Sequence, residues 1–120
     1  MYRAAAECDY TYLMNGFVYW DTFTYSEANC PVYNSIFGLS RGYDETADFR
    51  CFDVRDYRLF FKRLRRDLEY HGYDVKDNLK YFFVSEYGGI THRPHYHCLF
   101  FVTIPGMTPE EFDKFLERAW

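Results

Sequence analysis

The clearest periodic pattern in the chain predicts an amphipathic helix from about Val54 to Tyr70. Large apolar residues recur there at intervals of three and four, which is the repeat of one buried helix face. They are Tyr57, Phe60, Phe61, Leu64 and Leu68. Asp53 can cap the first turn and Gly72 can end the last one, so both boundaries of this helix are marked in the sequence.

Three segments rich in aromatic and β-branched residues predict strands: Asn15–Tyr25, Lys80–Tyr87 and His95–Thr103. The last two are separated by a turn that contains Gly88 and Gly89, so they are expected to form a hairpin. The stretch Asn34–Asp53 mixes Gly, Ser, Arg and acidic residues without sustained periodicity. We interpret it as a long surface connection.

Thr108 and Pro109 predict the start of a second amphipathic helix, which runs to Trp120. The order of elements is therefore β, α, β, β, α. It predicts a single α+β domain over residues 1–120, with an antiparallel sheet that carries its helices on one face, as in ferredoxin-like folds. A further strand would follow such an order, so we expect the domain to be C-terminally incomplete. Trp20 and Trp120 are expected in the core.

Composition narrows the class of molecule without identifying it. The chain has 120 residues and a net charge of -4, so no global positive field attracts nucleic acid, and any DNA contact must use a local basic patch. The four cysteines are scattered without a C-x-x-C pair, no apolar signal segment begins the chain, and no run is long enough to cross a membrane. We expect free thiols, a cytoplasmic location and no membrane partner.

Two histidines carry the strongest chemical signal. His95 and His97 alternate within an apolar strand, so both imidazoles point to the same side. If the hairpin is symmetric about its turn, Glu86 lies opposite His95, within the ~5 Å of a cross-strand pair. A register slip of one residue would turn Glu86 to the other face. In the symmetric register the sequence predicts a metal site of two imidazoles and one carboxylate.

Such a site suits a catalytic divalent cation that must also hold a phosphate oxygen. Nitrogen and oxygen ligands accept Mn²⁺ or Mg²⁺, and the ligand types leave Zn²⁺ open as well. A chance His-x-His in a strand is the alternative. The apolar neighbours Val84 and Leu99 argue against it, because buried polar groups without partners would be costly there.

The segments Tyr81–Gly88 (YFFVSEYG) and Arg93–Phe101 (RPHYHCLFF) resemble the replication initiators of microvirus-like single-stranded DNA phages, an HUH endonuclease family with an ORF2-like replication-associated domain. The segment Thr22–Tyr25 (TFTY) is similar to that family's first motif, and Leu59–Arg66 (LFFKRLRR) to its basic helix. The resemblance extends in patches from about Trp20 to Trp120, and the HUH segment is its most specific part.

This resemblance implies metal-dependent nicking of single-stranded origin DNA, with a phosphotyrosine intermediate, in the cytoplasm of a bacterial host. It implies Glu86, His95 and His97 as metal ligands, and it assigns the TFTY motif, with Thr22 and Thr24, to recognition of the DNA. The family's nucleophilic tyrosine lies on a helix after the metal strand. We therefore expect that helix beyond Trp120, and the nicking competence of residues 1–120 alone stays open.

Basic residues supply the candidate DNA contacts outside these motifs. Arg58, Lys62, Arg65 and Arg66 follow the polar side of the long helix, where they either meet phosphates or form an ordinary solvated face. Arg93 flanks the metal strand and is a further phosphate candidate. His92 is expected to be an exposed loop residue.

Other functions remain open at this stage. Cupin-like and histidine-triad metalloenzymes fit the spacing less well than an HUH enzyme, and a single-tyrosine HUH transposase shares the same geometry. A non-catalytic RRM-like module would instead stack bases of single-stranded nucleic acid on Phe82, Tyr96 or Phe100 and would need no divalent ion.

Overall fold

The computed structural model describes residues 2–42, 47–88 and 93–120, which form two compact units. The first unit contains Met1–Asp21, Arg55–Phe82 and Cys98–Trp120, and the second contains Thr22–Val54 and Phe83–His97. The elements are α1 (Tyr2–Leu13), β1 (Phe17–Thr24), the 3-10 turn η1 (Glu27–Asn29), β2 (Pro31–Asn34), β3 (Gly38–Arg41), β4 (Phe49–Arg50), α2 (Val54–Tyr70), β5 (Leu79–Tyr87), β6 (Pro94–Val102) and α3 (Pro109–Ala119).

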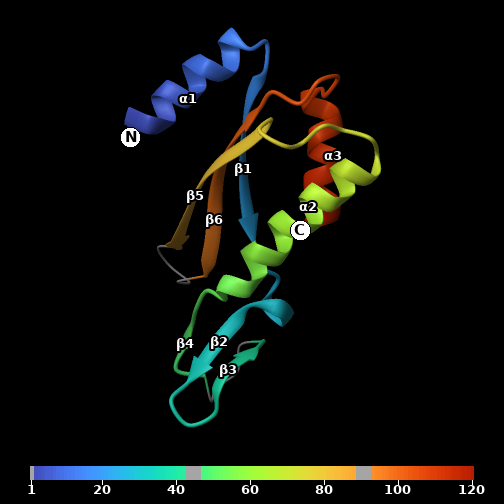
Figure 1. Ribbon diagram of the computed structural model, residues 1–120. Helices are drawn as coiled ribbons and strands as arrows, with labels where there is room; N and C mark the ends of the chain where they lie inside the picture. Colours follow the sequence, from blue (N-terminus) through green and yellow to red (C-terminus); the bar gives the residue numbers. More distant parts are fainter. Residues whose placement is uncertain (1, 43–46, 89–92) are drawn as a thin grey trace. The chain divides into compact units, whose positions relative to one another are not determined.

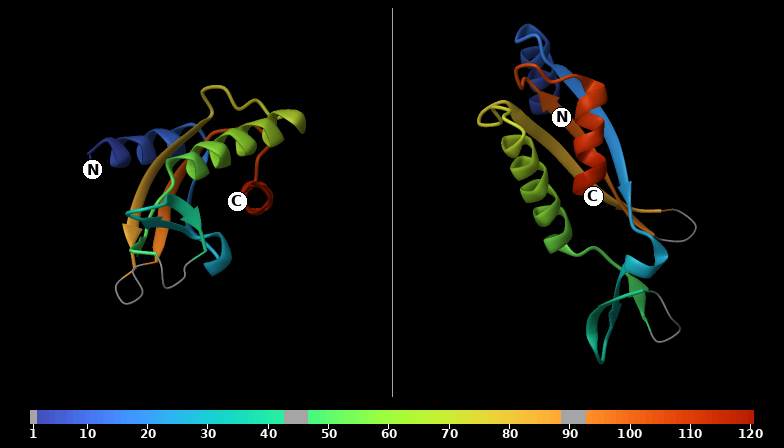
Figure 2. Two further views of the ribbon diagram at one scale, coloured as in Figure 1. Left: turned by 90° about the horizontal axis from the view of Figure 1, so that it is seen from below. Right: turned by 90° about the vertical axis from the view of Figure 1, so that its right-hand side faces the viewer.

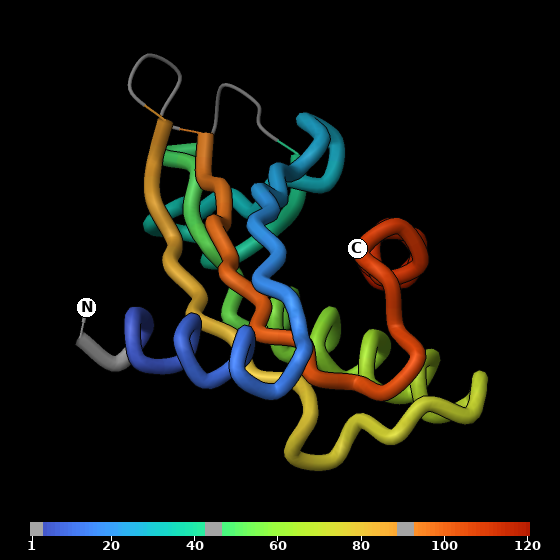
Figure 3. The backbone as a smooth tube through the Cα atoms, turned by 90° about the horizontal axis from the view of Figure 1, so that it is seen from above, coloured from blue at the N-terminus to red at the C-terminus, as the bar shows by residue number. Residues whose placement is uncertain are grey.

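The larger sheet has the strand order β1-β6-β5, with β6 in the middle (Figures 1 and 3). The crossover from β1 to β5 passes through α2, and the hairpin from β5 returns the chain between the two outer strands. This is the split β-α-β arrangement of a ferredoxin-like fold. The predicted α+β class is therefore confirmed, and each predicted strand is present with nearly the predicted bounds.

Helix α2 of the first unit begins and ends where its pattern predicts. Its apolar stripe is buried, and the ring of Phe61 stacks on that of Tyr81 in β5 at a centroid distance of 3.8 Å. The chain leaves the helix at Gly72, where φ is +85° and the amide donates to the Glu69 carbonyl. A side chain would be strained in that conformation, so the glycine fixes the end of the helix.

Helix α3 packs through Phe112, whose ring meets those of Phe17 and Tyr19 on β1 edge to face. The Thr108 hydroxyl accepts a hydrogen bond from the Glu111 amide, which confirms the predicted cap. The Tyr19 hydroxyl donates to the Asp113 carboxylate at 2.5 Å. These contacts attach α3 to the same sheet face that α2 covers, since Phe100 of β6 contacts both Phe61 and Phe112.

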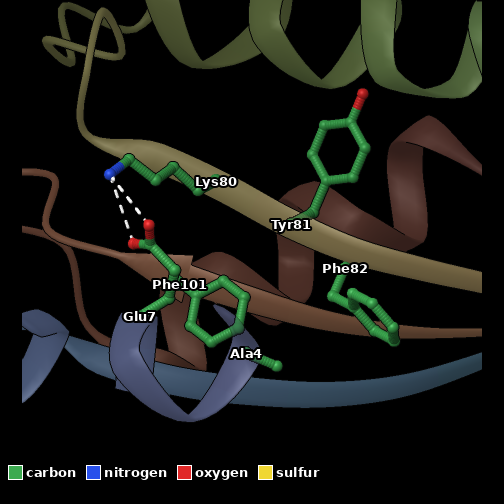
Figure 4. Close-up of a pocket in the computed structure, with 6 residues that line it drawn as sticks. All are labelled: Ala4, Glu7, Lys80, Tyr81, Phe82 and Phe101. Atoms are coloured by element: carbon green, nitrogen blue, oxygen red, sulfur yellow. Dashed lines mark hydrogen bonds and ion pairs between the residues drawn. The ribbon is translucent and has the colours of Figure 1, made fainter. Parts of the chain in front are cut away.

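Helix α1 was not predicted, and it covers the opposite face of the sheet in the first unit (Figures 2 and 3). Its Glu7 pairs with Lys80 at 3.2 Å, whereas Tyr81, the next residue of β5, points toward α2 (Figure 4). Between α1 and the strands lies a cavity of about 420 Å³, lined by Ala4, Glu7, Lys80, Tyr81, Phe82 and Phe101. Helices therefore lie on both faces, because α1 adds to the predicted pair.

The interpretation of Asn34–Asp53 as a surface connection was wrong. Strands β2, β3 and β4 form a second antiparallel sheet in the order β3-β2-β4. The Asn34 side chain accepts hydrogen bonds from the Ile36 and Phe37 amides, and Gly38 adopts φ +79° opposite Asn34. This Asn-to-Gly turn sets the hairpin. The strands are too short to show an alternating pattern, and so periodicity missed them.

Tyr96 is the centre of the second unit's core. Its ring stacks on Phe83 and packs against Phe52, and its hydroxyl lies 2.9 Å from the Tyr25 hydroxyl. This packing fixes which side of β6 is buried.

The two tryptophans that we expected in the core are both open to solvent. Trp20 is 58% exposed, because its neighbour Tyr19 takes the inward face of β1. Trp120 is 37% exposed at the end of α3, although its ring meets that of Phe60 edge to face. None of the helices in the described ranges is long and apolar enough to cross a membrane.

Candidate metal centre

The alternation along β6 separates a buried face from a partly open one. Tyr96 and Cys98 point inward and are buried, whereas His95 and His97 lie on the other side and are partly exposed. Glu86, on the neighbouring strand β5, is exposed. Two adjacent strands of the second unit therefore present all three predicted ligands.

The three side chains converge on one point. Oε1 of Glu86 lies 2.9 Å from Nε2 of His97 and 3.6 Å from Nε2 of His95. Ligand atoms bound about 2.1 Å from one octahedral ion are separated by about 3 Å, so small movements would place all three around a single cation. In residues 2–42, 47–88 and 93–120, this is the one group of three such side chains with metal-binding spacing.

A backbone hydrogen bond supports the register that brings Glu86 to His95. The Gly88 amide donates to the Arg93 carbonyl at 2.9 Å, which sets these two residues opposite each other. Two residues further along each antiparallel strand, Glu86 then stands opposite His95. The remainder of the turn, including Gly89 and His92, lies outside the described residues.

Gly88 also leaves room for the His95 imidazole. A Cβ atom at Gly88 would lie 3.2 Å from Cε1 of His95 and 3.4 Å from the Arg93 carbonyl oxygen. The first distance is shorter than ordinary van der Waals contact, so any larger residue would push on the ring. A glycine at the turn thus permits the close approach of a candidate ligand.

The electrostatics favour an ionised carboxylate at the centre of the group. The hydrogen bond from His97 and the positive charge that His97 can carry lower the pKa of Glu86 below its usual value. An ionised carboxylate with two imidazoles is a donor set suited to a divalent cation. Cys98 takes no part, because it faces the core, where burial raises the pKa of its thiol far above the usual range.

Thr22 supplies an outer contact that the sequence did not reveal. Its Oγ1 lies 3.1 Å from Nδ1 of His97, on the opposite side of the ring from Glu86. We had linked Thr22 and Thr24 to DNA only. Both are exposed on β1, while Phe23 between them is buried, so the Thr-x-Thr pattern does predict a shared open face. The pairing with His97 depends on the neighbouring strand.

The argument from burial cost was wrong for this face. Val84, one of the apolar neighbours that we expected to bury the histidines, is itself exposed, and Leu99 is only partly buried. The site is open toward solvent instead. An open face removes one reason for requiring a metal, but it gives a large substrate access to the ligands.

The basic residues proposed to contact DNA fall in both units. Arg93 belongs to the second unit, and its Nη2 donates to Glu27 at 2.9 Å. Arg58, Lys62 and Arg66 are exposed on α2 in the first unit, and so they are not part of the cluster around Glu86. Arg65 is partly buried and donates to the Leu79 carbonyl, a contact that joins α2 to the start of β5.

Comparison with known families gives one match. A family model described as a replication-associated protein of the ORF2 type matches residues 18–120. The match includes the TFTY motif, the basic helix α2 and the three candidate ligands, and α1 precedes it. No curated protein and no solved structure matches the chain significantly.

Proposed function

The chain belongs to the ORF2 family of replication-associated proteins, and from this premise we propose that it is a rolling-circle replication initiator that nicks single-stranded origin DNA with a divalent cation. The observation that carries the proposal is the convergence of Glu86, His95 and His97 on adjacent strands. We assign these residues as the ligands of Mn²⁺ or Mg²⁺. The reaction would take place in the cytoplasm of a bacterial host.

The ligand geometry fits a phosphoryl-transfer site. A bound divalent cation supplies charge withdrawal from the scissile phosphate. Glu86, His95 and His97 occupy one side of such an ion, and the exposure of this face leaves the other side open to a phosphate oxygen. The Thr22 hydroxyl accepts the Nδ1 proton of His97, which leaves the Nε2 lone pair directed at the ion.

The DNA-contacting residues extend the same proposal. Thr24 lies with Thr22 on the exposed side of β1, and Arg93 stands two residues before His95. Arg58, Lys62, Arg65 and Arg66 offer phosphate contacts along α2. A net charge of -4 makes such local contacts necessary, because the protein as a whole repels a polyanion.

The nucleophile that we propose is a tyrosine hydroxyl, in keeping with the family resemblance. Its attack on the phosphorus atom forms a phosphotyrosine bond, and the leaving 3′ oxygen takes up a proton to become a free hydroxyl that can prime synthesis. We assign this role to none of the thirteen tyrosines of the chain.

A titration with Mn²⁺ tests the metal site directly. The wild-type protein is expected to bind Mn²⁺ saturably, and His95→Ala and His97→Ala are expected to lose this binding. His71→Ala is a matched control, because His71 lies in the first unit and contacts Asp67 there. Wild-type protein without saturable binding, or histidine variants that bind like the control, would remove the basis of the proposal.

The RRM-like alternative loses two of its three stacking platforms. Tyr96 is 1% exposed and Phe100 is completely buried, so neither ring can meet a base. Phe82 remains exposed on β5. A strand-binding assay separates the two functions, since a base-stacking module would retain its affinity when His95 is replaced and the divalent ion is removed.

A further inference from the structure

Two arginines of the second unit share one carboxylate. Nε and Nη2 of Arg50 donate to Oε1 and Oε2 of Glu27 at 3.3 and 3.2 Å, and Nη2 of Arg93 donates to Oε1 at 2.9 Å. Arg50 ends β4, Glu27 lies in η1 and Arg93 precedes β6. Three segments that are distant in the sequence thus meet in one bridged cluster, which we name the Arg50–Glu27–Arg93 cluster.

This cluster carries an excess of positive charge. The hydrogen bond from Arg50 lowers the pKa of Glu27, so its carboxylate is ionised at neutral pH and offsets one of the two guanidinium charges. A neighbouring pair in the same unit provides the contrast. Arg41 and Asp53, 3.0 Å apart, balance each other one to one. The excess charge of the cluster stands out in a chain whose overall charge is negative.

The hydrogen-bonding capacity of the cluster is not used up. Within the described part of the chain, Nε of Arg93 is the one buried side-chain nitrogen or oxygen without a hydrogen-bond partner. Buried donors are nearly always paired, so an unpaired guanidinium N–H suggests a conformation that an additional acceptor would complete. The side chains of Arg50 and Arg93 are both partly exposed, which gives an anion access to the cluster.

The cluster is joined to the candidate metal ligands through the start of β6. The Arg93 carbonyl accepts the Gly88 amide, and Gly88 lies against the His95 ring. Arg93, Gly88 and His95 all belong to the second unit. A strand whose scissile phosphate met the metal ligands would therefore bring a neighbouring phosphate close to the two guanidinium groups.

We propose that Arg50 and Arg93, bridged by Glu27, form a binding site for a second phosphate of the single strand, next to the phosphate at the metal ligands. The proposal rests on the proposed function, since it takes the same strand as ligand. Guanidinium groups bind phosphate oxygens in forked pairs, and the shared carboxylate aligns both forks before the strand arrives. Glu27 is a positioning residue here.

The test measures the binding of oligodeoxythymidylate by fluorescence anisotropy, with Mn²⁺ present and over a range of salt concentrations. Arg50→Gln and Arg93→Gln are each expected to weaken binding about tenfold and to reduce the salt slope by about one. Arg118→Gln is the control, because it removes one arginine from a surface ion pair with Asp67 in the first unit. The double variant should lose little more than either single variant, since both arginines hold one phosphate.

Charge and geometry are separated by two further substitutions. Arg50→Lys and Arg93→Lys keep the charge and the pairing with Glu27 but lack the fork, so we expect weaker binding with an unchanged salt slope. Glu27→Gln makes the protein less negative, and we nevertheless expect no gain in affinity because the two arginines lose their alignment. Wild-type affinity in both lysine variants, or tighter binding by Glu27→Gln, would overturn the bridged site.

Failure of this inference can be told apart from failure of the proposed function. Saturable Mn²⁺ binding together with Arg50→Gln and Arg93→Gln losses no larger than that of Arg118→Gln rejects the second phosphate site alone. Loss of Mn²⁺ binding by the wild-type protein rejects the proposed function. Thermal melting identifies any variant that is unfolded, and the lysine variants then supply the result.

Discussion

Thr22 and His97 lie on adjacent strands with Oγ1 and Nδ1 3.1 Å apart, and Glu86 faces the other nitrogen of the same ring. This relationship determines which nitrogen of His97 carries the proton when a cation is bound. Donation from Nδ1 to Thr22 frees the Nε2 lone pair, so a hydroxyl on β1 orients a candidate ligand on β6.

Removing the Thr22 hydroxyl is expected to weaken the metal site. Thr22→Val keeps the shape of the side chain but leaves Nδ1 of His97 without this acceptor, and we expect Mn²⁺ affinity to fall about 10- to 100-fold. Calorimetric titration measures the change. Thr22→Ser restores the hydroxyl and should bind like the wild type, whereas wild-type affinity in the valine variant would contradict the orienting role.

Neutralising the carboxylate should have at least as large an effect. Glu86→Gln retains the size of the side chain but loses the charge that favours a cation, and we expect Mn²⁺ binding to weaken by at least about tenfold. Glu69→Gln is a suitable control, because Glu69 is an exposed acid on α2 in the first unit. Equal affinities for the two variants would exclude Glu86 as a ligand.

Two leucines on α2 test the packing of the first unit. Leu64 is completely buried, while Leu59 on the same helix is 48% exposed. Leu64→Ala is expected to lower the free energy of unfolding by about 2 to 5 kcal/mol, because it leaves a cavity in the core. Leu59→Ala should cost well under half of that. Chemical denaturation measures both, and similar losses would mean that α2 does not pack through the stripe containing Leu64.

The Tyr19–Asp113 hydrogen bond predicts a pH dependence of stability. This bond raises the pKa of the Tyr19 phenol above its usual value of 10.0. Its contribution is therefore fully present below about pH 10, where the unfolded tyrosine is still protonated, and is lost as the pH rises toward the pKa of the folded protein.

Tyr19→Phe should lower the free energy of unfolding by about 1 kcal/mol at neutral pH. The difference from the wild type should shrink above about pH 10. Tyr70→Phe, at an 86% exposed position, is the control. Denaturation curves over a pH series measure the effect, and a constant difference across that series would contradict the assigned hydrogen bond.

Local patterns in the sequence determined much of the architecture. The spacing of Phe60, Phe61, Leu64 and Leu68 fixed α2 and its buried face, because a helix repeats every 3.6 residues. Alternation likewise placed His95 and His97 on one side of β6, since successive side chains of a strand point to opposite faces. With a symmetric turn, the same rule brought Glu86 to them.

Only the tertiary structure decided which elements meet. Helix α1 and the β3-β2-β4 sheet have no strong periodic pattern, so their formation depends on what they pack or pair with. Thr22 is 75 residues from His97, and Glu27 is 66 residues from Arg93. Such pairs arise from strand order and register, which depend on interactions along the whole chain, whereas local spacing specifies only how neighbouring residues face.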